Sequence, residues 1–219
     1  MTDYGLGRRP APDERDHAYP MALAVPRTTT RTRRYWNASG WWGDQGRKPQ
    51  CVGYAWTHWL EDGPVTHDAP VPIVDPGWLY REAQLVDEWP GEDYDGTSVR
   101  AGAKVLQAKG LVGNYLWAES LRDVELALLE SGPVVVGTAW YESMFEPDRS
   151  GRISIGGGVV GGHAYLLDGV NSARRSIRLK NSWGRTWGRR GFATLSFDDL
   201  ARLLAEDGEA CLATELRTA

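Results

Sequence analysis

The sequence predicts an α+β fold in which a helical lobe precedes a β lobe and a cleft lies between them. Up to about residue 130, apolar residues recur at helical spacing between loops rich in glycine and proline. Beyond that point short β-branched runs dominate, beginning with Val134–Trp140. With 219 residues, 42% of them hydrophobic, the chain can bury one substantial core or two small, closely packed lobes. The change of period places the seam near residues 115–133.

Helix signals are concentrated in the first half of the chain. Three helix starts are marked by capping signals: Asp75 before Pro76, Thr97 or Ser98 before residue 99, and Ser120 with Asp123 three residues later. Glycines such as Gly110 mark helix ends. The predicted helices span residues 52–62, 77–86, 99–109, 121–131 and 198–206.

Strand signals follow the seam. The predicted strands span residues 134–140, 164–170, 176–180, 192–195 and 211–216. Residues 1–35 carry several prolines and little periodicity, so we expect an extended arm on the surface. The predicted division is therefore an arm over 1–35 and one domain over 36–219. Within that domain, a helical lobe covers about 36–120 and a β lobe about 121–219.

Charge and hydropathy exclude several function classes. The net charge is −4 with mixed signs, and the short run Arg31–Arg34 is interpreted as a solvated loop, so we expect no nucleic-acid partner. No apolar run is long enough to cross a bilayer and no secretory signal precedes the arm, so we expect no membrane partner. We expect a cytoplasmic monomer, with phage association or leaderless export as alternatives. The 21 Arg against 4 Lys favour a GC-rich bacterium or its phage.

Cys51 is the candidate nucleophile because it precedes a predicted helix. A cysteine in the first helical turn lies at the positive end of the macrodipole, which favours the thiolate. Gln45, six residues upstream, can donate its amide to the same place. A bridge to the second cysteine, Cys211, would remove the nucleophile, and we interpret Cys211 as a buried strand residue. The cysteines and histidines lack zinc spacing, so no metal site is predicted.

Among the four histidines, His163 is the candidate base. His17 and His67 lie in polar loops, and His58 is two helical turns from Cys51, about 10 Å along the axis and too far for proton transfer. Asn181 ends a strand that forms a hairpin with the His163 strand. Its amide oxygen can therefore accept from one ring N–H and fix the orientation of the other nitrogen. Without this context, His163 at a strand start would be as compatible with a structural role as with a catalytic one.

These residues together resemble the papain-like cysteine peptidases. Four of them occur in the family's order: Gln45, Cys51, His163 and Asn181. The Gln-to-Cys spacing and the run KNSWG-x-x-WG-x-x-G from Lys180 also match closely. The likeness extends from about Asp13 to the C terminus and includes the segments PDERD and DPGWLYREA. It implies a two-lobe fold with the Cys helix on the helical lobe and His and Asn on an antiparallel β lobe.

The resemblance also implies the role of each residue. Cys51 would be the nucleophile, His163 the general acid and base, and Asn181 the residue that orients His163. The Gln45 side chain and the Cys51 backbone N–H would form the oxyanion hole. No cofactor is implied, and the substrate would be a peptide or protein.

The implied substrate contacts lie on both sides of the cleft. Gly96 would let an extended peptide approach and pair as a strand, although the same segment also suits a plain helix N-cap. The Gly162 carbonyl would accept from the substrate. The full set of implied substrate-binding residues is Gly96, Thr97, Gly162, Trp183 and Trp187, with Trp183 covering the Asn–His bond and Trp187 lining the leaving-group side.

The sequence departs from the family around the nucleophile. It reads Lys48-Pro49-Gln50-Cys51-Val52 in place of the frequent C-G-S-C-W, so the loop lacks the cysteine that forms a bracing disulfide in secreted members. His163 and Asn181 follow Cys51 by 112 and 130 residues, against about 130–150 in papain-type enzymes. No long helical inhibitory propeptide is visible. Control of the activity would then lie in the arm, a partner or localisation.

A cysteine peptidase is the leading hypothesis, and two others remain open. An acyl transferase or transpeptidase would use the same triad but deliver the acyl group to an amine, which product analysis with added amines would reveal. A non-catalytic papain-fold binding or structural module would bind peptides without cutting them, and its Cys51 would be no more reactive than a free thiol.

Overall fold

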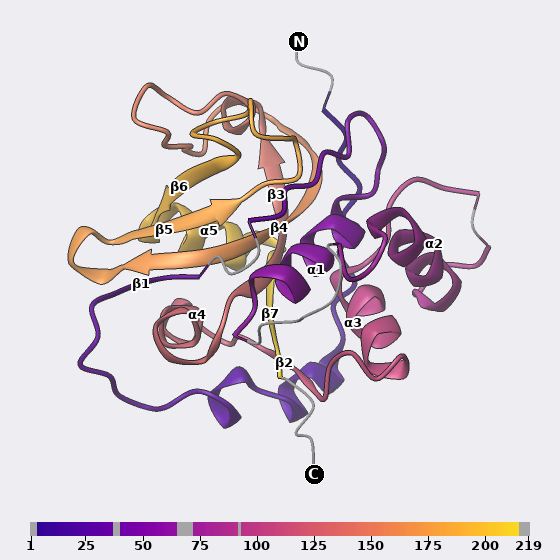
Figure 1. Cartoon of the computed structure of the whole chain (residues 1–219), viewed down its shortest axis with the longest axis horizontal. Helices are drawn as coiled ribbons and strands as arrows, with labels where there is room; N and C mark the ends of the chain where they lie inside the picture. The colour runs from indigo at the N-terminus through magenta and orange to yellow at the C-terminus, as the bar shows by residue number, and fades with distance from the viewer. Residues whose placement is uncertain (1–3, 37–39, 65–71, 92, 215–219) are drawn as a thin grey trace.

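The computed structural model describes residues 4–36, 40–64, 72–91 and 93–214. In Figure 1 helices lie on both sides of a twisted antiparallel sheet, and the first part of the N-terminal arm runs between the sheet and the helices on one side. The helices are α1 (Cys51–Asp62), α2 (Pro76–Val86), α3 (Val99–Ala108), α4 (Leu121–Leu126, continued by the π-helical turn Ala127–Ser131) and α5 (Phe197–Glu206). The strands are β1 (Arg33–Tyr35), β2 (Tyr115–Trp117), β3 (Val134–Tyr141), β4 (Val159–Asn171), β5 (Ser176–Lys180), β6 (Phe192–Ser196) and β7 (Glu209–Ala213). Short 3-10 turns span Glu14–Ala18, Met21–Leu23, Glu142–Phe145 and Ser172–Arg174.

The helices begin where the capping residues predicted. Ser98 accepts from Ala101 N at the start of α3, and Asp75 accepts from Trp78 N before α2. Ser120 forms the complete capping box at the start of α4. These caps are local in sequence, so the sequence alone was sufficient to predict them.

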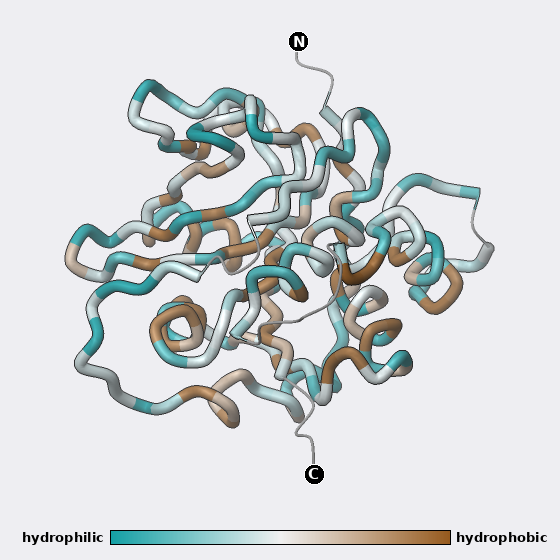
Figure 2. Tube along the Cα trace, viewed as in Figure 1, coloured by the Kyte–Doolittle hydropathy of each residue, from teal (hydrophilic) through white to brown (hydrophobic). Residues whose placement is uncertain are grey.

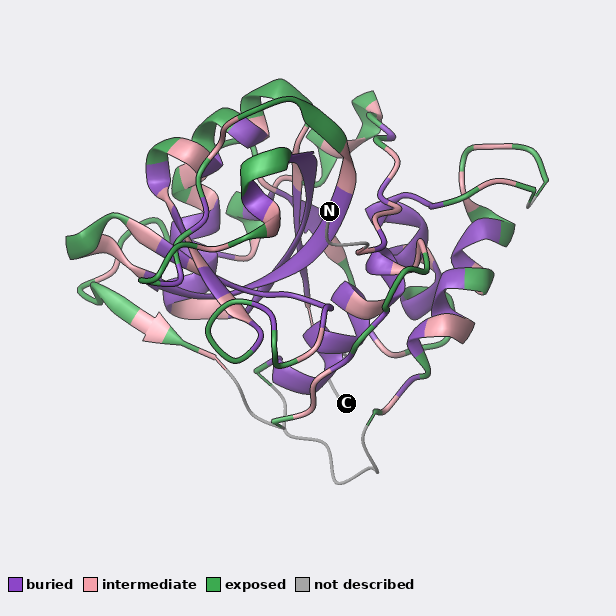
Figure 3. Ribbon diagram, turned by 90° about the horizontal axis from the view of Figure 1, so that it is seen from above, coloured by how far each residue is buried: buried purple, intermediate pink, exposed green. Residues whose placement is uncertain are grey.

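The strands of the sheet are hydrogen-bonded in the order β2-β7-β3-β4-β5-β6, and β1 also pairs with β4. Strand β3 is buried along its whole length, as the purple centre of Figure 3 shows. Successive residues of β4 serve two cores: Leu166 packs with α1–α3, whereas Tyr165 and Leu167 pack in the core that contains α4 and α5. Hydrophilic segments in Figure 2 follow the outer loops, including the one between β3 and β4. The central strands therefore join the helical and β parts of the molecule.

Two expectations about strand bounds were wrong, and two short strands were not predicted. β4 begins at Val159 instead of residue 164, so Gly161 and Gly162 lie inside the strand. Those glycines looked like loop residues, but a Cβ on Gly162 would lie 2.1 Å from the Arg8 carbonyl oxygen, so they make room for the arm. β7 spans 209–213 instead of 211–216, of which 215 and 216 lie outside the described residues. The short strands β1 and β2 were not predicted, because each is held only by partners distant in sequence.

The arm lies on the surface over only part of its length. Most of residues 12–35 are exposed or half-buried, whereas Gly5, Arg8 and Met21 are buried, and β1 at the arm's end pairs with β4. Prolines and low periodicity indicated an extended backbone but carried no information about its burial. The division into an arm over 1–35 and a domain over 36–219 stays a prediction.

Gly53 allows α1 and α2 to approach closely. A Cβ there would lie 2.2 Å from the Pro76 carbonyl oxygen. We expect Gly53→Ala to lower the free energy of unfolding by about 1–3 kcal/mol, despite the better helix propensity of alanine. Urea denaturation measures this loss in the free energy of unfolding. Gly77→Ala is the matched control, because its nearest neighbour, the Asp75 side chain, would be 3.3 Å away. An equal loss in both variants would contradict the explanation.

Candidate active site

Cys51 is the first residue of α1 and is completely buried. It is packed in the same buried core as Ala164, the residue after His163. The preceding loop is held to the β side because Gln45 N donates to Ser182 O at 2.8 Å. The helix start and the His163 strand therefore meet at the thiol.

His163 and Asn181 come together through the hairpin of β4 and β5. Leu166 pairs with Lys180, which brings the end of β5 beside the His163 region. The distance between His163 Nε2 and Asn181 Oδ1 is 2.8 Å, and Ser182 N also donates to that oxygen at 2.8 Å. Among the described residues, Nδ1 of His163 has no hydrogen-bond partner. One ring nitrogen is thus occupied and the other is free.

Tryptophans enclose the His163 ring. Trp183 stacks on the imidazole with ring centroids 4.6 Å apart, and Trp140 meets it edge-on at 4.8 Å. Trp187 is buried against Trp183, and its indole N–H donates to the Phe145 carbonyl at 2.8 Å. These rings exclude water from the His–Asn bond, which strengthens it.

The Gln45 amide is fully engaged. Its Nε2 donates to Lys48 O at 2.7 Å and to Gly5 O at 3.0 Å, and its Oε1 accepts from the Ser182 hydroxyl. Trp183 Nε1 also donates to Gly5 O, at 3.1 Å. The Gly5 carbonyl of the arm therefore accepts from the Gln45 amide, which the family resemblance assigned to the oxyanion hole.

The inner arm, residues 4–9, also occupies the implied substrate contacts. Gly7 N and Arg8 N both donate to Gly162 O at 3.0 Å. On the other side, Thr97 N donates to Gly7 O and Arg9 N donates to Thr97 O, each at 2.9 Å. The inner arm thus joins Thr97 to Gly162 in the way an extended peptide would.

Two glycines allow the inner arm to pass the nucleophile loop. A Cβ on Gly5 would lie 2.2 Å from Lys48 O, and one on Gly7 would lie 2.2 Å from Pro49 O. Tyr4 stacks on Trp183 with ring centroids 4.5 Å apart. Gly96, whose φ is +93°, would bring a Cβ to 2.5 Å from Gly7 O. The inner arm and the segment at Gly96 therefore both require glycine where they meet.

Burial keeps the site uncharged. It raises the pKa of the Cys51 thiol to about 12, although hydrogen bonds from the backbone oppose the shift. It lowers the pKa of His163 to about 4, against the hydrogen bond to Asn181. Both directions follow from the cost of placing a charge where water is excluded. With the arm in place, both shifts favour the neutral forms of the thiol and the imidazole.

Some site features were not visible from the sequence. Arg8 reaches Glu209 and Asp207, two carboxylates about 200 residues away in the chain. The available signal was the run Gly5-Leu6-Gly7, because alternate glycines in an extended segment indicate close backbone contacts. The sequence offered no means to find their partners.

The remaining candidate residues lie elsewhere. His58 is buried in α1, where its Nε2 accepts from Gly43 N at 3.3 Å, and His17 is exposed beside Glu119. His67 lies outside the described residues. Cys211 is buried in β7, and both cysteines are free. Within the described ranges, no three His, Cys, Asp or Glu residues are grouped to hold a metal, and no helix is long and apolar enough to cross a membrane.

Solved structures similar to this one are cysteine proteases. Xylellain, a cysteine protease from Xylella fastidiosa, superposes with a TM-score of 0.78 at 18% identity, covering 99% of this chain and 98% of its own. The fold is papain-like. A procathepsin L proteinase from the Tenebrio molitor larval midgut gives 0.64 at 15% identity over 98% of this chain and 79% of its own. Bromelain from Ananas comosus gives 0.61 at 14% identity over 85% of this chain and 100% of its own.

Two curated proteins match in sequence over part of the chain. Gamete and mating-type specific protein A of Dictyostelium discoideum is 33% identical over 115 residues, 51% of this chain and 25% of that protein. An uncharacterized peptidase C1-like protein of Acanthamoeba polyphaga mimivirus is 25% identical over 129 residues, 57% of this chain and 41% of that protein. The chain therefore spans less than half the length of either relative. No model of a known protein family matches it.

Proposed function

We propose that this protein is a cysteine peptidase that hydrolyses peptide bonds. The observation that carries the proposal is the His163–Asn181 bond of 2.8 Å beside a cysteine that begins a helix. With Nε2 held by Asn181, the free Nδ1 is the nitrogen that exchanges a proton with the Cys51 thiol. The papain-like fold and the peptidase relatives support the same reaction class.

The proposed reaction has two stages. The Cys51 thiolate attacks the substrate carbonyl carbon, and the Gln45 amide and the Cys51 backbone N–H stabilise the oxyanion. His163 then protonates the leaving amine, which leaves a thioester on Cys51. In the second stage His163 takes a proton from water, the hydroxide attacks the thioester, and the acid product leaves as the thiol is restored.

We also propose that the protein is latent while the inner arm occupies the cleft. The arm engages Gln45, Gly162 and Thr97, so no substrate can reach them at the same time. Displacement of the arm is therefore the expected step before catalysis.

The test measures peptide hydrolysis by the full-length chain carrying Gly5→Val, a substitution that the contact with Lys48 O does not allow with the arm seated. Adding Cys51→Ala should abolish turnover, and His163→Ala should lower kcat by about 10²–10⁴-fold. Asn181→Ala should lower kcat at least tenfold.

Cys211→Ala is the matched cysteine control and should leave kcat near that of its parent. Turnover that survives Cys51→Ala would refute the proposal, and dominant amide formation with added amines would favour acyl transfer.

A further inference from the structure

A hollow rich in arginine lies where β1 meets the turn between β4 and β5, and it shares no residue with the candidate active site. Its volume is about 570 Å³, which is within the range of small-molecule sites. We call this space the basic hollow. It is lined by Thr30, Arg31, Thr32, Arg33, Asn171, Ala173 and Arg174.

Backbone contacts hold the two sides of the basic hollow together. Arg33 is paired with Asn171 in the register of β1 and β4. Next to this pair, Ser172 N donates to Thr32 O at 2.8 Å. The Asn171 side chain caps the turn, because its Oδ1 accepts from Arg174 N at 3.1 Å. The side chains of Arg33 and Arg174 therefore begin from backbone positions that the fold fixes.

The side chains around the basic hollow supply hydrogen-bond donors and positive charge. Three arginines contribute guanidinium groups, and two threonines contribute hydroxyl groups. Because Oδ1 of Asn171 accepts from the backbone, its amide N–H groups are further donors. No Asp or Glu is among the described residues that line the space. Such a lining suits an anion that accepts hydrogen bonds from several directions.

Two of the three arginines lack an acidic partner. Arg31 Nε lies 3.5 Å from a carboxylate oxygen of Glu130. The guanidinium groups of Arg33 and Arg174 form no ion pair or hydrogen bond with the described residues. Burial lowers the pKa of the neighbouring Arg34, and the charge of Arg31 adds to that shift. In a chain of net charge −4, this excess of positive charge is a local feature.

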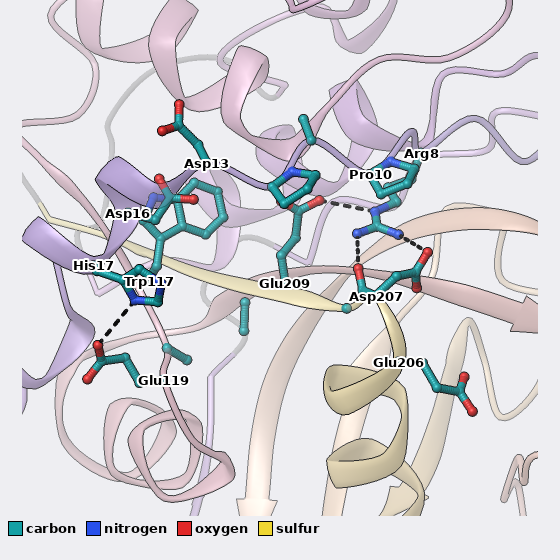
Figure 4. Close-up of a pocket in the computed structure, with 15 residues that line it drawn as sticks. Arg8, Pro10, Asp13, Asp16, His17, Trp117, Glu119, Glu206, Asp207 and Glu209 are labelled. Carbon is teal, nitrogen blue, oxygen red and sulfur yellow. Dashed lines mark hydrogen bonds and ion pairs between the residues drawn. The ribbon is translucent and has the colours of Figure 1, made fainter.

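The hollow shown in Figure 4, which is lined by carboxylates, differs in this respect. Arg8 bonds both Asp207 and Glu209 there. His17 Nδ1 lies 3.7 Å from a carboxylate oxygen of Glu119. Each basic side chain that lines that hollow thus has an acidic partner within the chain. In the basic hollow, two guanidinium groups are left for an anion from outside the chain.

We propose that the basic hollow binds a small soluble ligand that carries two or more linked phosphate groups. Arg33 on the β1 side and Arg174 on the turn side each donate a bidentate pair of hydrogen bonds to phosphate oxygens. The threonine hydroxyls and the Asn171 amide donate to the oxygens that remain. Linked phosphates suit the site better than carboxylates, because each tetrahedral group accepts from more directions. This inference is independent of the proposed peptidase function.

Isothermal titration calorimetry of the full-length chain with inorganic tripolyphosphate tests the proposal. We expect one ligand per chain, with a Kd that Arg33→Gln and Arg174→Gln each raise by about tenfold or more, since each variant removes a charge-assisted contact. Added sodium chloride should also weaken binding. Arg175→Gln is the matched control, because it removes the same charge beside Arg174, but its guanidinium bonds Asp198 at 2.6 Å. Its Kd should stay within about threefold of that of the unsubstituted chain.

Two other anions test the chemical class of the ligand. Citrate carries its charge on carboxylates, and sulfate is a single tetrahedral anion, so both should bind about tenfold or more weakly than tripolyphosphate. Citrate binding as tight as that of tripolyphosphate would overturn the assignment to phosphates. No binding of tripolyphosphate, or binding that both glutamine variants leave unchanged, would overturn the site. Arg33 and Arg174 are exposed, so both variants should keep the unfolding midpoint of the parent, and either one suffices if the other misfolds.

Discussion

Gly5→Val is expected to make Cys51 react with iodoacetamide at least ~100-fold faster at pH 7 than in the unsubstituted protein. The valine side chain cannot occupy a position 2.2 Å from the Lys48 carbonyl oxygen, so the inner arm must leave the cleft. Water then reaches Cys51 and His163, which are both completely buried with the arm in place. Because burial is what raises the Cys51 pKa to about 12, a fall of two units raises the thiolate fraction a hundredfold.

The pH dependence of alkylation should change as well. In the unsubstituted protein the rate should rise about tenfold per pH unit through neutrality, since the thiol has a pKa of about 12 and His163, with a pKa of about 4, stays neutral. In Gly5→Val the thiol pKa falls and the imidazole pKa rises. A plateau should then appear between the two, where thiolate and imidazolium coexist. Mass spectrometry of the Cys51 peptide over pH 5–10 gives both profiles.

Two further measurements make this test specific. Trypsin cleavage after Arg8 reports whether the inner arm has left the cleft, because Arg8 is buried while the inner arm is seated. Gly158→Val is the control glycine substitution, as the nearest atom to its Cβ, in the Glu142 side chain, would be 3.9 Å away. If trypsin cuts Gly5→Val rapidly while alkylation stays as slow as in the unsubstituted protein, burial by the arm is not the cause of the low reactivity of Cys51.

Lys180→Met is expected to lower the free energy of unfolding by about 3–5 kcal/mol. Lys180, at the end of β5, forms an ion pair with Asp62 at the end of α1, and both side chains are fully buried. Burial lowers the pKa of Lys180, and Asp62 opposes that shift. Removing the lysine takes one partner, the cation of this ion pair, away from the buried Asp62 carboxylate, between the helix that carries Cys51 and the strand that leads to Asn181.

Urea denaturation of two companion variants checks this explanation. The double variant Asp62→Leu, Lys180→Met should recover most of the loss, because an apolar pair leaves no uncompensated charge. Lys104→Met removes a lysine whose ion pair with Glu88 is partly exposed, and should change stability by less than about 1 kcal/mol. A double variant as unstable as Lys180→Met alone would show that the loss comes from packing.

The local signals in the sequence predicted the fold class and the main elements. Caps at Asp75, Ser98 and Ser120 form within three residues of the helices they begin, so they could be read directly. The change from helical to alternating periodicity placed the seam near residues 115–133, which stays a prediction. The hairpin of β4 and β5, separated by a short turn, was also local enough to bring Asn181 beside His163.

What the sequence by itself determined is therefore the papain-like fold and the candidate chemistry of Cys51, His163, Asn181 and Gln45. Only the tertiary structure decided the path of the arm, the neutral state of the thiol and imidazole, and the pairing of Arg8 with Glu209. The reason is the separation of the partners. Capping and hairpin contacts join near neighbours, whereas the arm contacts join residues 40 to about 200 positions apart, and burial of Cys51 depends on the whole set.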